Sequence, residues 1–313
     1  MAKMGFILLL LVFCCCSPQR DQVEADRLPD FDEMWDYGHP DSTESRFRDL
    51  LPLARSSGDT SYHAQLLTQI ARTQGLQMKF DEAHRTLDSV EVMLADDMVV
   101  AKIRYLLERG RVYNSSNEVD SARRFFVEAW EVARAGEEDF YAVDAAHMMA
   151  IIEPPEEQVA WSEKAMAVAE RSSDDRAGRW LGSLYNNTGW TYHDMGDYGK
   201  ALEMFEKALD WNMEHGTDER VRIARWTIAR AYRSLGQLEE ALQIQKDLES
   251  EIEEKGLDPS GYVFEEIAEC LLLLGREDEA KGYFAQAYDI LSQDQWLVAN
   301  QADRLERLKD LSE

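Results

Sequence analysis

The feature that most limits the possible folds of this chain is a repeat with a period of about 40 residues. Six alanines recur at intervals of 38 to 41 residues, each in a similar local pattern. A fixed period of this length is typical of arrays of stacked helix pairs. The six residues are Ala83, Ala122, Ala160, Ala201, Ala241 and Ala280.

The clearest copy of the pattern runs from Gly182 to about Gly216. Its apolar and small residues are spaced by three and four, which places them on one face of each of two successive helices. Small residues would let the paired helices approach closely. Left-handed turn residues are expected between the helices at Asn117, Gly196, Gly236 and Gly275, and Glu153-Pro154-Pro155 stops the helix in the third copy. The residues that define the copy are Tyr185, Gly189, Tyr192, Gly196, Ala201, Phe205 and Ala208.

On these residues the chain resembles the tetratricopeptide repeat family. The period exceeds the usual 34 residues of that family and is similar to the long-helix variety found in bacterial regulatory and sensor arrays. The resemblance implies an all-α, right-handed superhelical solenoid of about six antiparallel helix pairs over residues 60–293. It also implies a non-enzymatic function in binding other proteins.

Both ends of the repeat region are expected to carry capping helices, because an exposed solenoid end needs one polar face. Residues 42–59 predict an N-terminal cap that Pro52 interrupts. Residues 294–313 predict one final helix, with Arg304 and Arg307 outward and an apolar face inward. That inward face is Leu297, Val298, Ala302, Leu305 and Leu308.

The first 41 residues have a different character. Residues 1–16 combine Lys3, an apolar stretch too short to span a bilayer comfortably, and Cys14-Cys15-Cys16. This resembles a bacterial lipoprotein signal, and Cys16 is the expected lipidated residue because polar sequence follows it at once. The alternatives are lipidation at Cys14 or Cys15, an ordinary cleaved signal, or an uncleaved anchor. Residues 17–41 predict an acidic tether in which 31–37 either docks on the first helices or stays free.

These features predict an exported protein, anchored by lipid to the periplasmic or extracellular face of a bacterial membrane. A cytoplasmic protein is the alternative if residues 1–16 are not processed. The formal net charge of −27 argues against nucleic-acid partners, and it limits membrane contact to the N-terminal lipid or signal segment.

The sequence predicts neither catalysis nor a cofactor. It contains no phosphate-binding loop, HExxH, CxxC or calcium-loop pattern, and its six histidines are scattered. We therefore expect no catalytic residues, no cofactor and no metal. Cys270 is the one cysteine outside the N-terminal segment, and a small buried side chain is the expected role.

The resemblance also implies which side chains face the concave groove, because positions 2, 5, 9 and 12 of each first helix do so in that family. Residues 219–234, the first helix of the fifth copy, contain five arginines against the single acid Glu219. Arginine and tryptophan are well suited to anchoring a bound chain. The selected groove residues are Arg72, Arg104, Arg111, Asn186, Trp190, His193, Trp226, Arg230 and Arg233.

One hypothesis is that an acidic or carboxylate-bearing peptide binds near Asn186, Trp190, Trp226, Arg230 and Arg233. Three alternatives stay open: the arginines pair with acids of neighbouring helices, the tryptophans pack between repeats, or the register of the fifth copy is shifted by one. The predicted function is a lipid-anchored scaffold that binds a peptide or helix of a partner protein. A sensor array that binds a small ligand or signal peptide is the alternative.

Overall fold

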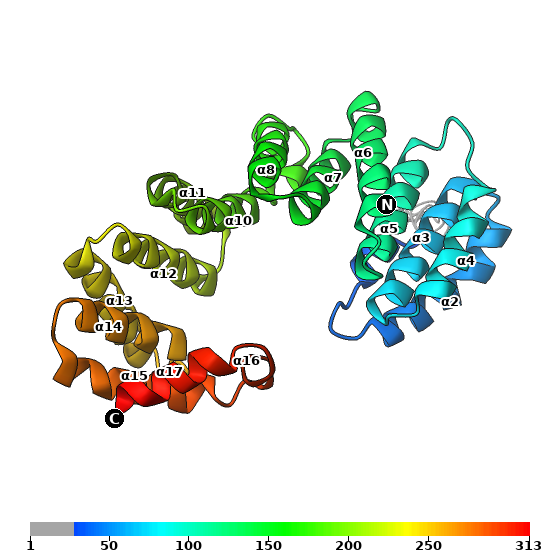
Figure 1. The fold of residues 1–313 in the computed structure, drawn as a ribbon. Coiled ribbons are helices and arrows are strands. Elements are labelled where there is room, and N and C mark those ends of the chain that lie inside the picture. The colour runs from blue at the N-terminus through cyan, green and yellow to red at the C-terminus, as the bar shows by residue number, and fades with distance from the viewer. Residues whose placement is uncertain (1–27) are drawn as a thin grey trace, which may run out of the picture. The chain divides into compact units, whose positions relative to one another are not determined.

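The computed structural model of the protein describes residues 28–313. The predicted signal segment with Cys16, and residues 17–27 of the predicted tether, lie outside the described residues. Between 28 and 313 all regular structure is helical, with no strand, as the repeat pattern predicts. The helices divide into two compact units, one ending at Met93 and the other spanning Leu94–Glu313 (Figure 1).

The first unit consists of η1 (Phe31–Met34), α2 (Pro40–Ser56), α3 (Thr60–Leu76) and α4 (Phe80–Glu91). Its apolar core includes Phe31, which packs edge-on against Phe47 with ring centroids 6.3 Å apart. The indole N–H of Trp35 donates a 3.0 Å hydrogen bond to the side-chain oxygen of Gln69. The segment around η1 therefore docks on α2 and α3.

Pro52 does not interrupt α2, contrary to the expectation from sequence. The helix continues through Pro52 and ends at Ser56, one turn later. A proline removes one backbone N–H and crowds the preceding turn, but it does not forbid a helix whose other side is held by packing. Phe47 and Ala54, on either side of Pro52 in sequence, are both buried in this core.

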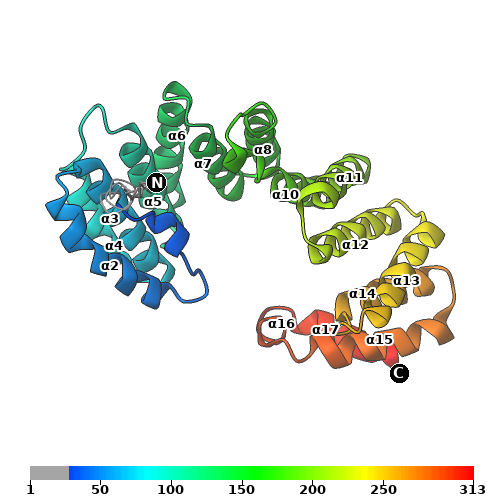
Figure 2. The same ribbon diagram turned by 180° about the vertical axis from the view of Figure 1, so that it is seen from behind.

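The second unit stacks helix pairs (Figure 2). The first helices of these pairs are α5 (Val99–Ser115), α7 (Asp139–Ile152), α10 (Leu181–Asp194), α12 (Asp218–Ser234) and α14 (Gly261–Leu273). The second helices are α6 (Val119–Ala135), α8 (Pro155–Ala169), α11 (Tyr198–His215), α13 (Leu238–Glu254) and α15 (Glu277–Leu291). The shorter elements are α9 (Asp175–Gly178), α16 (Gln295–Asn300) and α17 (Ala302–Ser312).

Close contact between a glycine and a phenylalanine holds two of these pairs together. A Cβ atom built on Gly189 of α10 would lie 2.4 Å from the Phe205 ring of α11, and one on Gly110 of α5 equally close to Phe126 of α6. Both phenylalanines are fully buried. Burial of such a side chain stabilises the fold by about 2 kcal/mol, so the small residue is needed to admit the ring.

The residues predicted to be left-handed in the turns between paired helices do adopt that conformation. Gly196, Gly236, Gly275 and Asn117 have φ of 81°, 80°, 73° and 65°. In the third pair Glu153 and Pro154 are extended instead, and α8 begins at Pro155. That pair therefore closes without a left-handed residue.

The third copy differs from its predicted register. Five of the six repeat alanines are buried, but Ala160 is exposed. The buried residues of α8 instead include Ser162, Met166 and Ala169. They stand two residues later than predicted, because the extended Glu153-Pro154 connection replaces the turn found in the other pairs.

The C-terminal segment forms two helices rather than the one expected. The N-cap carboxylate of Asp294 accepts from the backbone of α16, and the chain bends at Gln301 before α17 begins. Val298 is 51% exposed and Ala302 is also exposed, whereas Leu297, Leu305 and Leu308 are buried. The break rotates the apolar face between the two helices, so only part of the predicted face packs inward.

Candidate functional site

Three aromatic side chains form a row across three successive first helices. The ring centroid of Trp190 on α10 lies 6.0 Å from that of Trp226 on α12, which lies 6.3 Å from that of Tyr262 on α14. The indole N–H of Trp226 donates a 3.1 Å hydrogen bond to the backbone carbonyl of Tyr262. We call Trp190, Trp226 and Tyr262 the aromatic row. All three are at least partly exposed, so they present apolar area in a fixed arrangement.

Neighbouring side chains hold the α10 end of the aromatic row. The Trp190 ring packs against Phe205 at 5.2 Å and against His193 at 5.3 Å. His193 Nε2 shares a 2.9 Å hydrogen bond with the Ser234 hydroxyl. Burial, with the nearby positive charge of Arg230, lowers the pKa of His193, so this imidazole is neutral at pH 7.

Arg230 and Arg233, two of the predicted groove residues, both pair with one buried carboxylate. Arg233 donates from Nε and Nη2 to Glu266 at 2.7 and 3.0 Å, and Arg230 Nε lies 3.3 Å from the same group. Glu266 is 5% exposed. Burial by itself would lower the pKa of Arg233. The hydrogen bonds to Glu266 and the negative charge of Glu266 outweigh this effect, so the pKa of Arg233 is raised. Arg230 and Arg233 therefore pair with an acid of a neighbouring helix, which was one of the alternatives left open by the sequence.

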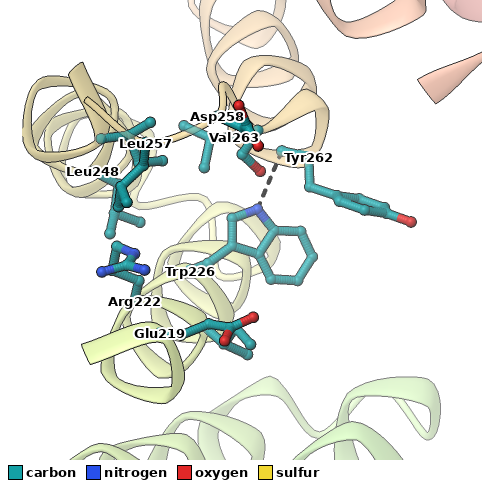
Figure 3. Close-up of a pocket in the computed structure, with 11 residues that line it drawn as sticks. Glu219, Arg222, Trp226, Leu248, Leu257, Asp258, Tyr262 and Val263 are labelled. Atoms are coloured by element: carbon teal, nitrogen blue, oxygen red, sulfur yellow. Dashed lines mark hydrogen bonds between the residues drawn. The ribbon is translucent and has the colours of Figure 1, made fainter. Parts of the chain in front are cut away.

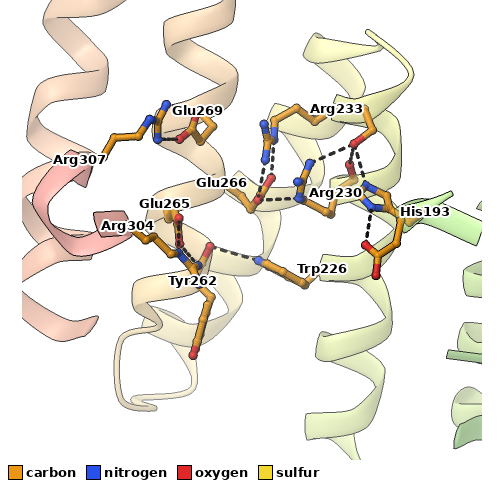
Figure 4. Close-up of polar contacts among 12 residues, drawn as sticks. His193, Trp226, Arg230, Arg233, Tyr262, Glu265, Glu266, Glu269, Arg304 and Arg307 are labelled. Carbon is orange, nitrogen blue, oxygen red and sulfur yellow. Dashed lines mark hydrogen bonds and ion pairs between the residues drawn. The ribbon is translucent and has the colours of Figure 1, made fainter. Parts of the chain in front are cut away.

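Two more carboxylates of α14 extend this arrangement towards the C-terminal helix (Figure 4). Arg304 of α17 pairs with Glu265, and Arg307 pairs with Glu269. Both were expected to point outward. Arg307 is exposed, as expected, and Arg304 is partly buried, and the guanidinium groups of both reach the nearly buried Glu265 and Glu269. We call these groups the α14 network: Glu265, Glu266, Glu269, Arg230, Arg233, Arg304 and Arg307.

The other predicted arginines lie elsewhere. Arg72 belongs to the first unit, where its guanidinium lies 5.9 Å from the Trp35 ring and 5.6 Å from the Tyr37 ring. On α5, Arg104 Nε donates to the Tyr141 hydroxyl at 2.8 Å.

The second arginine of α5, Arg111, pairs with Glu108 on its own helix and with Asp144 on α7. The arginines of α5 thus tie it to α7, as Arg233 ties α12 to α14. Of the predicted residues, the structure brings together Trp190, His193, Trp226, Arg230 and Arg233, with Asn186 one turn before Trp190 on α10.

A cavity beside the aromatic row was not predicted from sequence. It has a volume of about 630 Å³ and lies between α12, the end of α13 and the start of α14 (Figure 3). Its apolar lining is Ile223, Trp226, Leu248, Ile252, Leu257 and Val263. A volume of this size is in the range of small-molecule pockets.

The described residues also bear on metal binding, membrane spanning and thiol chemistry. Residues 28–313 contain no group of three or more His, Cys, Asp or Glu side chains placed to hold a metal ion. Within the same range no helix is both long and apolar enough to cross a membrane. Cys270 is buried and unpaired, and burial raises the pKa of its thiol to about 12, which confirms the expected packing role.

The family model for the tetratricopeptide repeat matches residues 155–210, which span α8 to most of α11. Residues 155–210 are therefore similar to tetratricopeptide repeats. No enzyme family was found, and this repeat fold is typically non-catalytic. No curated protein matches the chain.

Several solved structures have a similar fold at low sequence identity. The apo form of RapI has a TM-score of 0.68 at 12% identity, covering 88% of this chain and 75% of that one. The STAND protein PH0952 from Pyrococcus horikoshii, described as having a tetratricopeptide repeat sensor, scores 0.67 at 16%, covering 85% of this chain and 42% of that one. PilW, a type IV pilus biogenesis factor, scores 0.53 at 18%, covering 75% and 97%. At such identities the likeness establishes the fold alone.

Proposed function

We propose that this protein is a non-enzymatic scaffold, anchored to a bacterial membrane by lipid, that binds a peptide or helix of a partner protein along α10, α12 and α14. Tetratricopeptide repeats in general bind partner proteins and peptides. The observation that carries the proposal is the aromatic row, which presents three partly exposed rings from three successive helices. Large rigid side chains of this kind dominate the energetics of protein interfaces.

The arrangement of the row also favours binding, because little needs to be ordered when a partner arrives. Trp190 is held by Phe205 and His193, and Trp226 is held by its hydrogen bond to the Tyr262 carbonyl. A surface that is already ordered loses less conformational entropy on association. Arg230 and Arg233 contribute less to the proposed binding than the aromatic row, because an acidic partner would have to compete with Glu266 for them.

Site-specific crosslinking in cells tests this proposal. A photo-reactive amino acid at Asn186, one turn from Trp190, should give a discrete crosslinked product in cells that express the full-length chain. The same probe at the exposed residue Glu206 on α11 serves as the control and should give none. Trp190→Ala should reduce the Asn186 product at least fivefold. Equal products from both sites, or none from Asn186, would contradict the proposal.

The proposed anchor is a lipid on Cys16, and the acidic tether is the part of residues 17–41 that precedes η1, because the segment around η1 packs on α2 and α3 and α2 begins at Pro40. The support is the short apolar segment that ends in three cysteines and is followed directly by polar sequence. Metabolic labelling with an alkynyl fatty acid should mark the full-length protein, and Cys16→Ala should remove the label and release the protein from the membrane fraction. Persistent labelling in that variant would move the modification to Cys14 or Cys15.

A second candidate function is that of a sensor for a small ligand or signal peptide. The cavity of about 630 Å³ beside Trp226 favours it. The similar fold of NprR, a quorum sensor from B. thuringiensis, has a TM-score of 0.58 at 14% identity, covering 93% of this chain and 81% of that one. A thermal-shift screen of small anionic ligands and short peptides tests this candidate: a saturable rise in melting temperature that Ile223→Asp abolishes would support it over the scaffold.

A further inference from the structure

The cavity beside Trp226 coincides with a local change in the repeat. Residues 182, 222 and 261 stand at the same distance before the repeat alanines Ala201, Ala241 and Ala280. In the fourth copy a Cβ built on Gly182 would lie 2.6 Å from the Trp211 ring, and in the sixth a Cβ on Gly261 would lie 3.2 Å from the Cβ of Ile290, which is the equivalent of Trp211. In both copies an apolar side chain lies directly on a glycine.

The fifth copy has charged residues at both of these positions. Its equivalent of Gly182 is Arg222, and its equivalent of Trp211 is Glu251, with a closest charged-atom distance of 3.7 Å. An ion pair thus stands where the neighbouring copies have a glycine covered by an apolar side chain. Arg222 lines the cavity together with apolar residues that include Ile252 and Val263.

The connection between α13 and α14 also shapes the cavity. It spans residues 255–260, whereas α11 and α12 are joined by residues 216–217 alone. Gly256 has φ of 61°, which lets the chain turn sharply after α13. The connection brings Leu257 and Asp258 to the mouth of the cavity (Figure 3).

The mouth combines exposed apolar surface with unpaired negative charge. Ile223 is 51% exposed, and Leu257 and Tyr262 are 40% exposed. Glu219 and Asp258 line the mouth and are exposed, and neither has an ion-pair partner within residues 28–313. Arg222 is the one basic lining residue, and Glu251 lies beside it. The charge at the mouth is therefore complementary to a cation.

We propose that this cavity binds a segment of a partner protein that presents one large apolar side chain next to lysine or arginine. The apolar side chain enters between Ile223, Leu257 and Val263, and the basic group lies against Glu219 and Asp258. This inference rests on the proposed scaffold function and specifies the chemistry of its partner. It differs from the acidic peptide expected from sequence, because the arginines of α12 assigned to that peptide pair within the fold.

Peptide binding to the full-length chain tests the inference. The probe is a fluorescein-labelled peptide with one phenylalanine between two pairs of lysines. Its binding is measured by fluorescence anisotropy. One comparison peptide replaces the lysines by glutamate, and another replaces the phenylalanine by alanine. We expect the lysine–phenylalanine peptide to bind at least tenfold more tightly than either, and added salt to weaken it.

Variants separate the cavity from the general acidity of the protein. The double variant Glu219→Lys with Asp258→Lys should weaken binding about tenfold. This is the change in affinity expected when two surface ion pairs with the peptide are lost, one at each carboxylate. Glu206→Lys with Asp210→Lys makes the same charge change on α11 and should alter binding less than twofold. Ile223→Asp should weaken binding at least fivefold. Circular-dichroism melting of each variant checks that it is folded.

Several results would overturn the inference. Equal weakening by the two charge-reversed pairs would show attraction by net charge alone. Equal affinity for the alanine peptide would remove the role of the apolar cavity, and tighter binding of the glutamate peptide would reverse the charge assignment. Failure of peptide binding with retained crosslinking from Asn186 would reject this inference alone. Peptide binding without any Asn186 crosslink would instead reject the proposed binding surface along α10, α12 and α14.

Discussion

The Glu266 carboxylate is 5% exposed and lies against the guanidinium groups of Arg230 and Arg233. A buried charge is tolerated when it is paired and hydrogen-bonded, and it becomes costly when its partner is removed. The three side chains therefore stabilise the contact between α12 and α14. Substitution of both arginines by glutamate would crowd three carboxylates, so it would not test binding separately from folding.

Neutralisation of Glu266 should be strongly destabilising. Glu266→Gln removes the one carboxylate that both largely buried guanidinium groups contact, and we expect it to lower the free energy of unfolding by about 3 kcal/mol. Urea denaturation of the full-length chain measures this. The exposed Glu206→Gln on α11 is the control and should change stability by less than about 0.5 kcal/mol. A loss below about 1 kcal/mol for Glu266→Gln would contradict the structural role of the pair.

His147 should make stability depend on pH. Burial lowers its pKa from the ordinary 6.5, with Asp144 opposing and Arg111 adding to this shift. The unfolded chain therefore binds the proton more readily, so this contribution to stability is present above about pH 6.5 and is lost as the pH falls towards the folded pKa. Urea unfolding at about pH 7.5 and about pH 5.5 measures this. Between these two pH values the free energy of unfolding should fall less for His147→Gln than for the native chain. An unchanged loss would contradict this.

At the scale of helix pairs, the phenylalanine that packs against the partner helix in other copies is replaced in α13. Phe126, Phe205 and Phe284 are buried at this position, and the fifth copy has Gln245 there. Gln245 is 0% exposed, and neither of its amide atoms has a hydrogen-bond partner within residues 28–313. A buried amide without partners costs about 1–3 kcal/mol, so this pair is less stable than its neighbours at that position.

Removal of that amide should stabilise the protein. Gln245→Leu keeps similar bulk and removes the unsatisfied groups, and we expect a gain of about 1–2 kcal/mol in the free energy of unfolding. Urea denaturation of the two chains measures the gain. Gln243→Leu, at an exposed position of the same helix, is the matched control and should be nearly neutral. Destabilisation by Gln245→Leu would mean that the amide makes hydrogen bonds, for instance to ordered water.

At the scale of the whole molecule, the chain folds as two compact units that meet in sequence at Met93 and Leu94. The connection between α4 and α5 covers residues 92–98, and within it Val92 is 86% exposed. Asp96 and Asp97 are exposed as well. Exposed connections with few buried contacts are the preferred sites of proteolysis.

Limited proteolysis should therefore separate the two units. Endoproteinase Asp-N should cut the full-length protein first at Asp96 or Asp97 and leave a resistant fragment that continues to the C-terminus. Mass spectrometry of a time course identifies the first cut. Initial cleavage at Asp258, in the connection that borders the cavity, would instead mark residues 255–260 as the least protected part of the chain.

Much of the architecture follows from the sequence because helix pairing is a local, periodic property. The spacing of alanines and aromatic residues predicts which helical faces are buried, and glycine or asparagine at the turns predicts the left-handed residues found at Asn117, Gly196, Gly236 and Gly275. The pattern failed where local chemistry changed: extended Glu153-Pro154 moved the register of α8 by two residues. It failed again at Gln301, where the C-terminal segment bends into two helices.

The sequence by itself determined the repeat, the helix pairs and a set of residues around Trp190 and Trp226. Only the tertiary structure decided what those residues face. Arg233 pairs with Glu266 from the next repeat, and Arg222 meets Glu251 where its neighbours pack apolar groups. Periodicity specifies the face of a helix on which a side chain lies, but its partner comes from another helix about 30 residues away. Charge pairing and the cavity therefore depend on the stacking of whole repeats.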